Sequence, residues 1–490
     1  MDIEQFRKAG YAAIDHICDY YANLDKRPVS SSVKPGYLAP LLPTAAPEEG
    51  EDFAAIAADY GRVIEQGLTH WQHPSFFAYF PTAASFEGIL GDLYATAAPN
   101  PGFNWSCSPA CTELEGVVMD WAAQLLGLDT AFHNAAGVGG GALQTTASES
   151  ALIATVAARE RFLALPTQSP SKLEELVLYV TTQTHSLGLK AGRVLGLQVR
   201  ALEVRAEDKY ALRGAALRQA LEEDAAAGRR PFMLIATVGT TSSGAVDNLP
   251  EIQAVLKDHP EVWLHVDAAW AGIALCCPET RDALFLDAIN AAADSFCTNF
   301  HKWGLVNFDA STLWVRDRKS LTDALDITPP FLRTAHGDAG TVVDYRNWHL
   351  ALGRRFRSLK LWFVLRGFGA AGFRAHIRQG IALNATFGAL LAASDILTLV
   401  TPPALALTVF RLAPPDRDLD LAALNTLNAS FFARLAVRPD LAITQTVLNG
   451  VFCVRFAIGA ARTTEAHVRA AFDVITEEAR TALALWESAV

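Results

Sequence analysis

The sequence predicts an α/β protein with a mostly parallel sheet in a large domain and a smaller α+β domain at the C-terminal end. Three short, nearly all-apolar runs, LVLYVT, PFMLIATVG and VWLHVD, are typical of parallel strands buried on both faces. Helical patterns at 212–227 and 249–257 separate the later runs, and this alternation indicates a doubly wound fold. After about residue 370 the pattern changes to helices with short runs such as ALTVFRL and VFCVRFAI, which predicts a separate α+β unit.

The chain begins with a predicted amphipathic helix over residues 2–24, because Ile3, Phe6 and Ile17 belong to a series of apolar residues at helical spacing. Prolines at 28, 35, 40, 43 and 47 then predict an irregular stretch. A helix followed by such a linker is poorly placed to bury its apolar face on its own domain. We therefore expect residues 1–80 to pack on a dimer partner, with the large domain at 81–370 and the small domain at 371–490.

Composition excludes several classes of protein. The 490 residues are 51% hydrophobic and 19% charged, which excludes intrinsic disorder, and a net charge of −11 argues against nucleic-acid or anionic-membrane partners. The N-terminus resembles no secretory signal, and no apolar run reaches the roughly 18–20 residues of a membrane span, so a soluble cytoplasmic protein is expected. Seven cysteines without a CxxC pattern predict reduced thiols. His70 with His73, and His265 with Asp267, lack a third nearby ligand, so no metal is predicted.

The first candidate site is the glycine-rich run at 137–141, which residues 145–148 connect to a predicted helix. A flexible loop entering a helix N-terminus, with hydroxyl groups in the first turn, is suited to hold a phosphate. Two alternatives stay open. With Ala142 the run also fits the dinucleotide pattern G-x-G-x-x-A, although no hydrophobic strand precedes it, and Ser148 with Glu149 would also serve as a helix cap.

Three further residues follow or end predicted strands, where ligands bind in open parallel sheets. Asp267 ends a buried strand, and a carboxylate there needs a cation or a strong donor. Lys302 has the apolar neighbours Phe300 and Trp303, which favour its neutral, nucleophilic amine. His185 follows the first apolar run, where its ring would stack on a flat heteroaromatic ligand. A phosphate, a ring nitrogen, a ring face and an aldehyde together describe pyridoxal phosphate.

An aromatic segment indicates the substrate class. Residues 70–82 and 103–105 contribute aromatic side chains with no charged residue among them, namely Trp71, Phe76, Phe77, Tyr79, Phe80, Phe103 and Trp105. Such a wall suits an aryl side chain and disfavours that of glutamate or lysine, although about half of these rings are equally explained as ordinary core.

Several long motifs resemble the aromatic L-amino acid decarboxylases, the group II decarboxylases that use pyridoxal phosphate. These are HPSFFAYFPTAAS, SPACTELE, ATVGTTSSGAVDNL, WLHVDAAWAG, NFHKWGLVNFD and GRRFRSLKLWFVLR. The resemblance implies a type I, aspartate aminotransferase-like fold and a homodimer in which each site borrows residues from the neighbouring subunit. It also implies that Lys302 binds the cofactor's aldehyde covalently, that Asp267 pairs with the ring nitrogen and that His185 stacks on the ring.

The resemblance implies further roles for residues of the site. Around the cofactor it places Ala147, Ser148, Thr241, Ala269, Asn299 and His301. Around the substrate it places Trp71, Phe80, Pro81, Thr82 and Phe103, with Thr82 near the substrate carboxylate. Gly353 stands where members that favour hydroxyphenyl substrates often carry Ser, which leaves room for an indole, whereas Trp270 replaces the usual Tyr and narrows the pocket. The choice among phenylalanine, tyrosine, tryptophan and dopa therefore stays open.

One departure from the family pattern concerns the product. The run DITPPFLRTAHGDAG matches the family's mobile catalytic loop, but Phe331 replaces the Tyr whose hydroxyl protonates Cα after carbon dioxide leaves. The same change marks the aromatic acetaldehyde synthases, in which dioxygen reacts instead and the products are an aryl acetaldehyde, carbon dioxide, ammonia and hydrogen peroxide. The alternative is a simple decarboxylase, with His185 or His336 as proton donor.

Other classes are less favoured. A pyridoxal-phosphate aminotransferase typically needs an Arg for a second carboxylate, and the aromatic segment offers none. A catalytically inactive homologue is expected to lose Lys302 or Asp267, and both are present. A nicotinamide oxidoreductase stays possible, because the glycine-rich run also fits the dinucleotide pattern.

Overall fold

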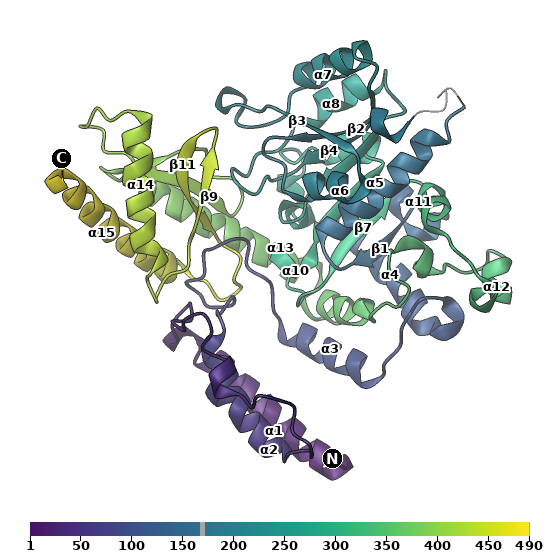
Figure 1. Cartoon of the computed structure of the whole chain (residues 1–490), viewed down its shortest axis with the longest axis horizontal. Coiled ribbons are helices and arrows are strands. Elements are labelled where there is room, and N and C mark those ends of the chain that lie inside the picture. Colours follow the sequence, from purple (N-terminus) through teal and green to yellow (C-terminus); the bar gives the residue numbers. More distant parts are fainter. Residues whose placement is uncertain (167–171, 490) are drawn as a thin grey trace.

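The computed structural model describes residues 1–166 and 172–489. Figure 1 shows an N-terminal arm, a large α/β domain and a smaller domain that ends at the C-terminus. The large domain contains a seven-stranded sheet and the small domain a four-stranded sheet. The predicted fold class is therefore confirmed.

The large sheet has the strand order β1-β7-β6-β5-β4-β2-β3, in which β7 alone runs antiparallel to its neighbours. The three predicted strands are β2, β4 and β5, and β2 and β5 are buried along their whole length, as expected for strands covered on both faces. The strand bounds are β1 (Gly140–Gln144), β2 (Leu176–Thr181), β3 (Gln198–Leu202), β4 (Arg230–Thr237), β5 (Trp263–Asp267), β6 (Ser295–Asn299) and β7 (Ser311–Val315).

Helices cover the sheet and connect its strands. One of them, α5, crosses one face and contacts β4, β5, β6 and β7, while α7 packs on α8 and contacts β3 and β4. The helix bounds in this domain are α3 (Phe86–Ala97), α4 (Pro109–Leu126), α5 (Ala147–Leu163), α6 (Leu187–Leu195), α7 (Gly214–Ala226), α8 (Leu249–Leu256), α9 (Leu286–Ala292), α10 (Phe300–Trp303), α11 (Arg318–Leu325) and α12 (Ala335–Asp338).

The expectation of a flexible glycine loop is wrong for part of the run at 137–141. Gly140 and Gly141 open strand β1, which pairs with β7. A Cβ atom at Gly141 would lie 2.5 Å from side-chain atoms of both Met119 and Trp314, so this glycine serves close packing. The turn into α5 lies further along, and Thr146 is the N-cap residue.

The helix α13 (Arg357–Ala392) connects the two domains. Gly369 interrupts it with a φ of +60°, a conformation that glycine adopts without strain, and this kink lies beside the predicted boundary near residue 370. The small sheet has the antiparallel order β10-β11-β9-β8. Its elements are β8 (Leu397–Leu399), β9 (Leu407–Leu412), α14 (Leu421–Ala436), β10 (Thr444–Leu448), β11 (Val451–Ala457) and α15 (Glu465–Ala489).

The N-terminal arm extends away from both domains in Figure 1 and carries α1 (Ile3–Ala22) and α2 (Phe53–Asp59). The predicted first helix is thus confirmed, and Asp2 and Gln5 close a capping box at its start. No residue of α1 is buried in the single chain, and Phe6 is 62% exposed. No helix in the described ranges has the length and apolar character of a membrane span.

Candidate active site

A cavity of about 360 Å³ lies where the parallel strands β2, β4, β5 and β6 end or continue into loops, a volume in the range of small-molecule sites. It brings together most residues that the sequence singled out. Those that line it are Trp71, Phe80, Thr82, Ala147, Ser148, His185, Thr241, Asp267, Ala269, Asn299, His301 and Lys302.

Four predicted residues do not line this cavity in the single chain. Pro81 is buried and packs against Gly459, although its chain neighbours Phe80 and Thr82 line the cavity. Phe331 is 79% exposed in the loop after α11. Gly353 borders a separate hollow formed with residues 92–101 and 354–357. The backbone carbonyl of Phe103 accepts a hydrogen bond from the Arg346 amide at 3.0 Å.

Asp267 and Lys302 face the cavity from β5 and α10. Burial raises the pKa of the Asp267 carboxyl, and the nearby Lys302 charge opposes that rise. Burial also lowers the pKa of the Lys302 amine, which the negative charge of Asp267 opposes. No described residue hydrogen-bonds to Lys302 Nζ, which lies 6.0 Å from the centre of the Phe80 ring. The amine is therefore available as a nucleophile.

The N-terminus of α5 supplies an anion site. Because the helix begins at Ala147, the amides of Ala147 and Ser148 have no acceptor inside the helix. The side chain of Thr146 accepts a hydrogen bond from the Glu149 amide at 3.4 Å, and the Glu149 carboxylate accepts one from the Thr145 amide at 2.8 Å. These contacts close the turn around the free amides, an arrangement that suits a phosphate.

Buried polar atoms at the strand ends lack partners in the described chain. The Oδ1 atom of Asn299, the last residue of β6, and the Oγ1 atom of Thr237, the last residue of β4, have no hydrogen bond, and both residues line the cavity. Burial lowers the pKa of His301 to about 3, and its Nδ1 accepts a hydrogen bond from the Ala310 amide at 2.9 Å. The neutral ring therefore keeps its proton on Nε2. Such unpartnered groups fit a phosphorylated heteroaromatic ligand.

His185 stands in the turn between β2 and α6. Its Nδ1 accepts a hydrogen bond from the Leu187 amide at 3.3 Å, so the neutral ring carries its proton on Nε2. His185 therefore offers both a ring face and one N–H donor to a ligand in the cavity.

Aromatic side chains form the wall of the cavity. The rings of Phe80 and Trp270 stack with centroids 4.3 Å apart, and those of Trp71 and Tyr79 stack at 5.4 Å. Phe308, which the sequence did not single out, adds a further ring. Of the aromatic segment, Trp71, Tyr79 and Phe80 line the cavity, whereas Phe76 and Phe77 are buried core residues.

Arg455, which the sequence did not single out, reaches the cavity from β11 of the small domain. It is 3% exposed, and its Nε and Nη2 atoms have no partner, while Nη1 donates to Thr444 Oγ1 at 3.2 Å. A single charged residue inside the apolar run VFCVRFA was the available signal. The absence of an arginine in the aromatic segment therefore does not argue against an aminotransferase.

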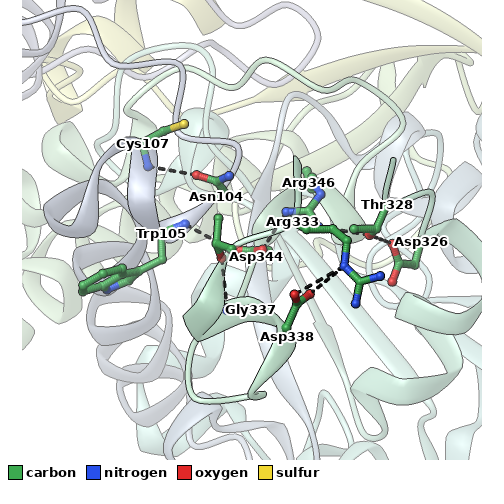
Figure 2. A network of polar contacts seen from close by, with 11 residues as sticks. Asn104, Trp105, Cys107, Asp326, Thr328, Arg333, Gly337, Asp338, Asp344 and Arg346 are labelled. Atoms are coloured by element: carbon green, nitrogen blue, oxygen red, sulfur yellow. Dashed lines mark hydrogen bonds and ion pairs between the residues drawn. The ribbon is translucent and has the colours of Figure 1, made fainter. Parts of the chain in front are cut away.

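A polar network ties the base of the loop that carries Phe331, as Figure 2 shows. Arg346 donates to Asp344 Oδ2 at 2.6 Å and to Thr328 Oγ1 at 3.0 Å, and these two partners lie on opposite sides of Phe331 in the chain. Asp344 Oδ1 also accepts a hydrogen bond from the Trp105 amide at 3.0 Å. Both ends of the loop therefore converge on one buried guanidinium group.

The histidine pairs considered as metal ligands have other partners. His70 Nδ1 lies 3.0 Å from the Tyr20 hydroxyl, and His265 Nδ1 lies 2.7 Å from Ser295 Oγ. Across the described ranges, no three His, Cys, Asp or Glu side chains gather as a metal site.

Comparisons with known proteins agree on one family. The model of the pyridoxal-dependent decarboxylase conserved domain matches residues 35–413. Tryptophan decarboxylase 2 of Oryza sativa subsp. japonica is 42% identical over 482 residues, which cover 98% of this chain and 95% of that protein. Phenylacetaldehyde synthase of Arabidopsis thaliana is 43% identical over 482 residues, with 98% and 96% covered. The crystal structure of Oryza sativa TDC with PLP and tryptamine superposes with a TM-score of 0.94 at 37% identity, covering 98% of this chain and 99% of the other.

Proposed function

Because the chain belongs to the pyridoxal-dependent decarboxylase family, whose cofactor is pyridoxal phosphate, we propose that it removes the carboxyl group of aromatic L-amino acids. We propose further that Phe331 diverts the reaction to oxidative decarboxylation and deamination. The observation that carries the first proposal is the cavity that joins Lys302 and Asp267 to an aromatic wall. The wall matches an aryl side chain in shape and polarity.

Bound pyridoxal phosphate supplies an aldehyde that captures an amine and a ring that withdraws electrons from Cα. In the proposed site, Lys302 provides the amine that links to that aldehyde, and Asp267 provides the negative charge for the ring nitrogen. Ala147, Ser148 and Thr241 hold the phosphate, with the unpaired amides of α5 as donors. Ala269, Asn299 and His301 line the remaining sides, and His185 covers the ring.

The substrate is proposed to enter between Trp71 and Phe80. Thr82 is proposed to lie near the substrate carboxylate, and its backbone is held by a hydrogen bond from Gln72 Nε2 to its carbonyl oxygen. Arg455 adds a buried cation with two unpartnered nitrogen atoms, which favours an anionic group on the ligand. An aminotransferase, which also uses a buried arginine, is the less favoured alternative, since the two relatives named above are a decarboxylase and an aldehyde synthase.

A homodimer with shared sites is proposed as the active form. Two observations support it: the apolar face of α1 has no cover in the single chain, and Phe103, Phe331 and Gly353 lie outside the cavity. Residues that belong to the substrate site but lie away from it in one chain are expected to complete the site of the partner. We expect the dimer to act in the cytoplasm, because all seven cysteines are free thiols.

The second proposal concerns the proton that Cα needs after carbon dioxide leaves. A phenylalanine has no proton to give, so the residue at position 331 cannot act as a general acid. Dioxygen then takes two electrons from the substrate and becomes hydrogen peroxide. The amino acid, one dioxygen and one water give one aryl acetaldehyde, one carbon dioxide, one ammonia and one hydrogen peroxide.

A simple decarboxylase that releases the arylalkylamine is the second candidate. The observation in its favour is the proton on Nε2 of His185, which lines the cavity and would replace the missing hydroxyl as the donor.

The deciding experiment is an aerobic incubation with phenylalanine, tyrosine, tryptophan and dopa, in which amine, aldehyde and peroxide are quantified together. Aldehyde matched one to one by peroxide, with a switch to amine in Phe331→Tyr, is the expected result. Phe308→Tyr is the matched control, because it places the same hydroxyl on a ring of the cavity wall that lies outside the loop. Amine as the only product of the wild-type enzyme would overturn the oxidative proposal and leave the decarboxylase proposal standing.

A further inference from the structure

A line of buried polar side chains leads along β5 and β6 to Asp267. Successive side chains of a strand point to opposite faces, so His265 and Asp267 share one face of β5, and Ser295 and Cys297 share one face of β6. The strand register pairs His265 with Ser295 and Asp267 with Cys297. All four residues are therefore neighbours on the same face, in an order that ends at the cavity.

Short contacts connect these neighbours. Trp263 Nε1 lies 2.7 Å from Ser295 Oγ, and the same oxygen lies 2.7 Å from His265 Nδ1. On the other side of the imidazole ring, Nε2 lies 3.6 Å from Cys297 Sγ. That sulfur lies 3.8 Å from Asp267 Oδ1. The series joins the indole of Trp263 to the carboxylate without a break.

The direction of each hydrogen bond follows from the number of protons. An indole N–H only donates, so Ser295 Oγ accepts from Trp263. The Ser295 hydroxyl must donate its own proton, and His265 Nδ1 is the remaining neighbour of that oxygen in the described chain. A neutral imidazole that accepts at Nδ1 carries its proton on Nε2, which then donates to Cys297 Sγ. The Cys297 thiol therefore donates its own hydrogen bond to Asp267 Oδ1.

Burial keeps every intermediate member of the series neutral. His265 has no exposed surface, and burial lowers its pKa to about 3. Cys297 also has no exposed surface, and burial together with the charge of Asp267 raises the pKa of its thiol. The imidazole therefore carries one proton and the thiol keeps its own near neutral pH, as the series requires.

We propose that Ser295, His265 and Cys297 form a one-directional hydrogen-bond relay that holds Oδ1 of Asp267 and leaves its Oδ2 for the ring nitrogen of pyridoxal phosphate. The Ala269 amide donates to the same Oδ1 at 3.0 Å, while Oδ2 has no partner in the described chain. The relay residues touch neither substrate nor cofactor, so they are positioning residues. The proposal rests on the role proposed above for Asp267.

The relay stabilises the ionised carboxylate. Burial disfavours the charge on Asp267, and each donor on Oδ1 offsets part of that cost. An ionised Asp267 in turn favours a protonated ring nitrogen, which is the state that withdraws electrons best. Loss of one donor is therefore expected to weaken cofactor binding and to shift the ring nitrogen toward its neutral form.

The first measurement is the tautomer of His265 in wild-type holoenzyme labelled with ¹⁵N-histidine. Long-range ¹H–¹⁵N spectra distinguish a proton on Nε2 from one on Nδ1, and the spectrum of His265→Gln identifies the signal among the 12 histidines. We expect a neutral ring with its proton on Nε2. In Ser295→Ala we expect that proton to redistribute toward Nδ1. A wild-type His265 that is charged, or protonated on Nδ1, would overturn the relay without the need for any variant of Cys297.

The second measurement follows the cofactor. Cys297→Ala is expected to raise the dissociation constant of pyridoxal phosphate about tenfold and to move the shift of ¹⁵N-labelled ring nitrogen toward the neutral form. Cys297→Ser, which keeps one donor and one acceptor, should restore both values to within about threefold. Cys276→Ala is the matched control, since this thiol is equally buried but contacts Cys277 and not Asp267. It should leave both values unchanged.

Asp267→Asn distinguishes a failure of the relay from a failure of the role proposed for Asp267. If this variant moves the ring-nitrogen shift and Cys297→Ala does not, the relay is wrong and the role of Asp267 stands. If Asp267→Asn leaves the shift unchanged, the role proposed for Asp267 fails, and the relay fails with it. Where Cys297→Ala does not fold, the wild-type tautomer and Ser295→Ala still decide the matter.

Discussion

The rings of Phe80 and Trp270 stack with centroids 4.3 Å apart and planes 12° from parallel. The stack joins the segment before α3 to the loop after β5, on the wall of the cavity. Trp270 is fixed in this position because its Nε1 donates to the carbonyl oxygen of Gly239 at 2.6 Å. The size of the ring at position 270 therefore limits the space beside Phe80 in the cavity.

Trp270→Tyr is expected to favour larger substrates. A smaller ring leaves space beside Phe80, so kcat/KM for tryptophan relative to phenylalanine should rise about tenfold, as a change of this size in an apolar pocket does. The variant also loses the bond to Gly239, which should lower the free energy of unfolding by about 1 kcal/mol. Trp314→Tyr loses a comparable bond, to the Met119 carbonyl, away from the cavity, and should leave the substrate ratio unchanged. A ratio altered equally in both variants would contradict this role.

Arg346→Ala is expected to release the base of the loop. Arg346 and Asp344 are both buried, and removal of one member of a buried ion pair leaves the other unpaired, at a cost of about 3–5 kcal/mol. Limited proteolysis between residues 328 and 344 should therefore accelerate, and urea unfolding should show the lower free energy of unfolding. Arg333→Ala, in an exposed pair with Asp338 on the same loop, should cost less than about 1 kcal/mol. Equal effects of the two variants would contradict the anchoring role of Arg346.

Phe6→Asp is expected to dissociate the proposed dimer. Phe6 lies on the uncovered apolar face of α1, where a carboxylate would be buried without a partner on association. Light scattering coupled to gel filtration should show a shift toward monomer, with loss of activity because each site would lack the residues of its neighbour. Lys8→Glu is the control, because it changes the charge two residues further along the same helix. It should leave the mass of the dimer in solution unchanged. A stable, active Phe6→Asp dimer would show that α1 lies outside the interface.

Two buried histidines predict acid sensitivity. Burial lowers the pKa of His265 and of His301 from 6.5 to about 3 in the folded chain. Between these values the unfolded chain binds more protons than the folded chain, so the free energy of unfolding falls as pH falls. Each histidine contributes about 1.4 kcal/mol per pH unit in this window. Urea unfolding at pH 5.5, 5.0 and 4.5, where the histidine of the unfolded chain is almost fully protonated, measures the slope, and His265→Gln should reduce it by about one proton. An unchanged slope would show that His265 titrates normally.

Much of the fold was predictable because it is encoded locally. The runs LVLYVT and VWLHVD are mostly apolar, and β2 and β5 form there. The helix at α1 follows from apolar spacing and from its capping box. The flexible loop predicted at the glycine run was wrong, because Gly141 serves close packing against Met119 and Trp314. A sequence does not state which distant side chains lie against a glycine.

For the site, the sequence by itself determined the candidate reactive residues, since Lys302, Asp267 and His185 stand in motifs or at strand ends. Only the tertiary structure decided which side chains join them. Arg455 comes from the small domain, and Cys297 comes from a neighbouring strand whose register places its thiol beside Asp267. The physical reason is that local patterns encode helices and strands, whereas strand register and domain contacts depend on the packing of residues far apart in the chain.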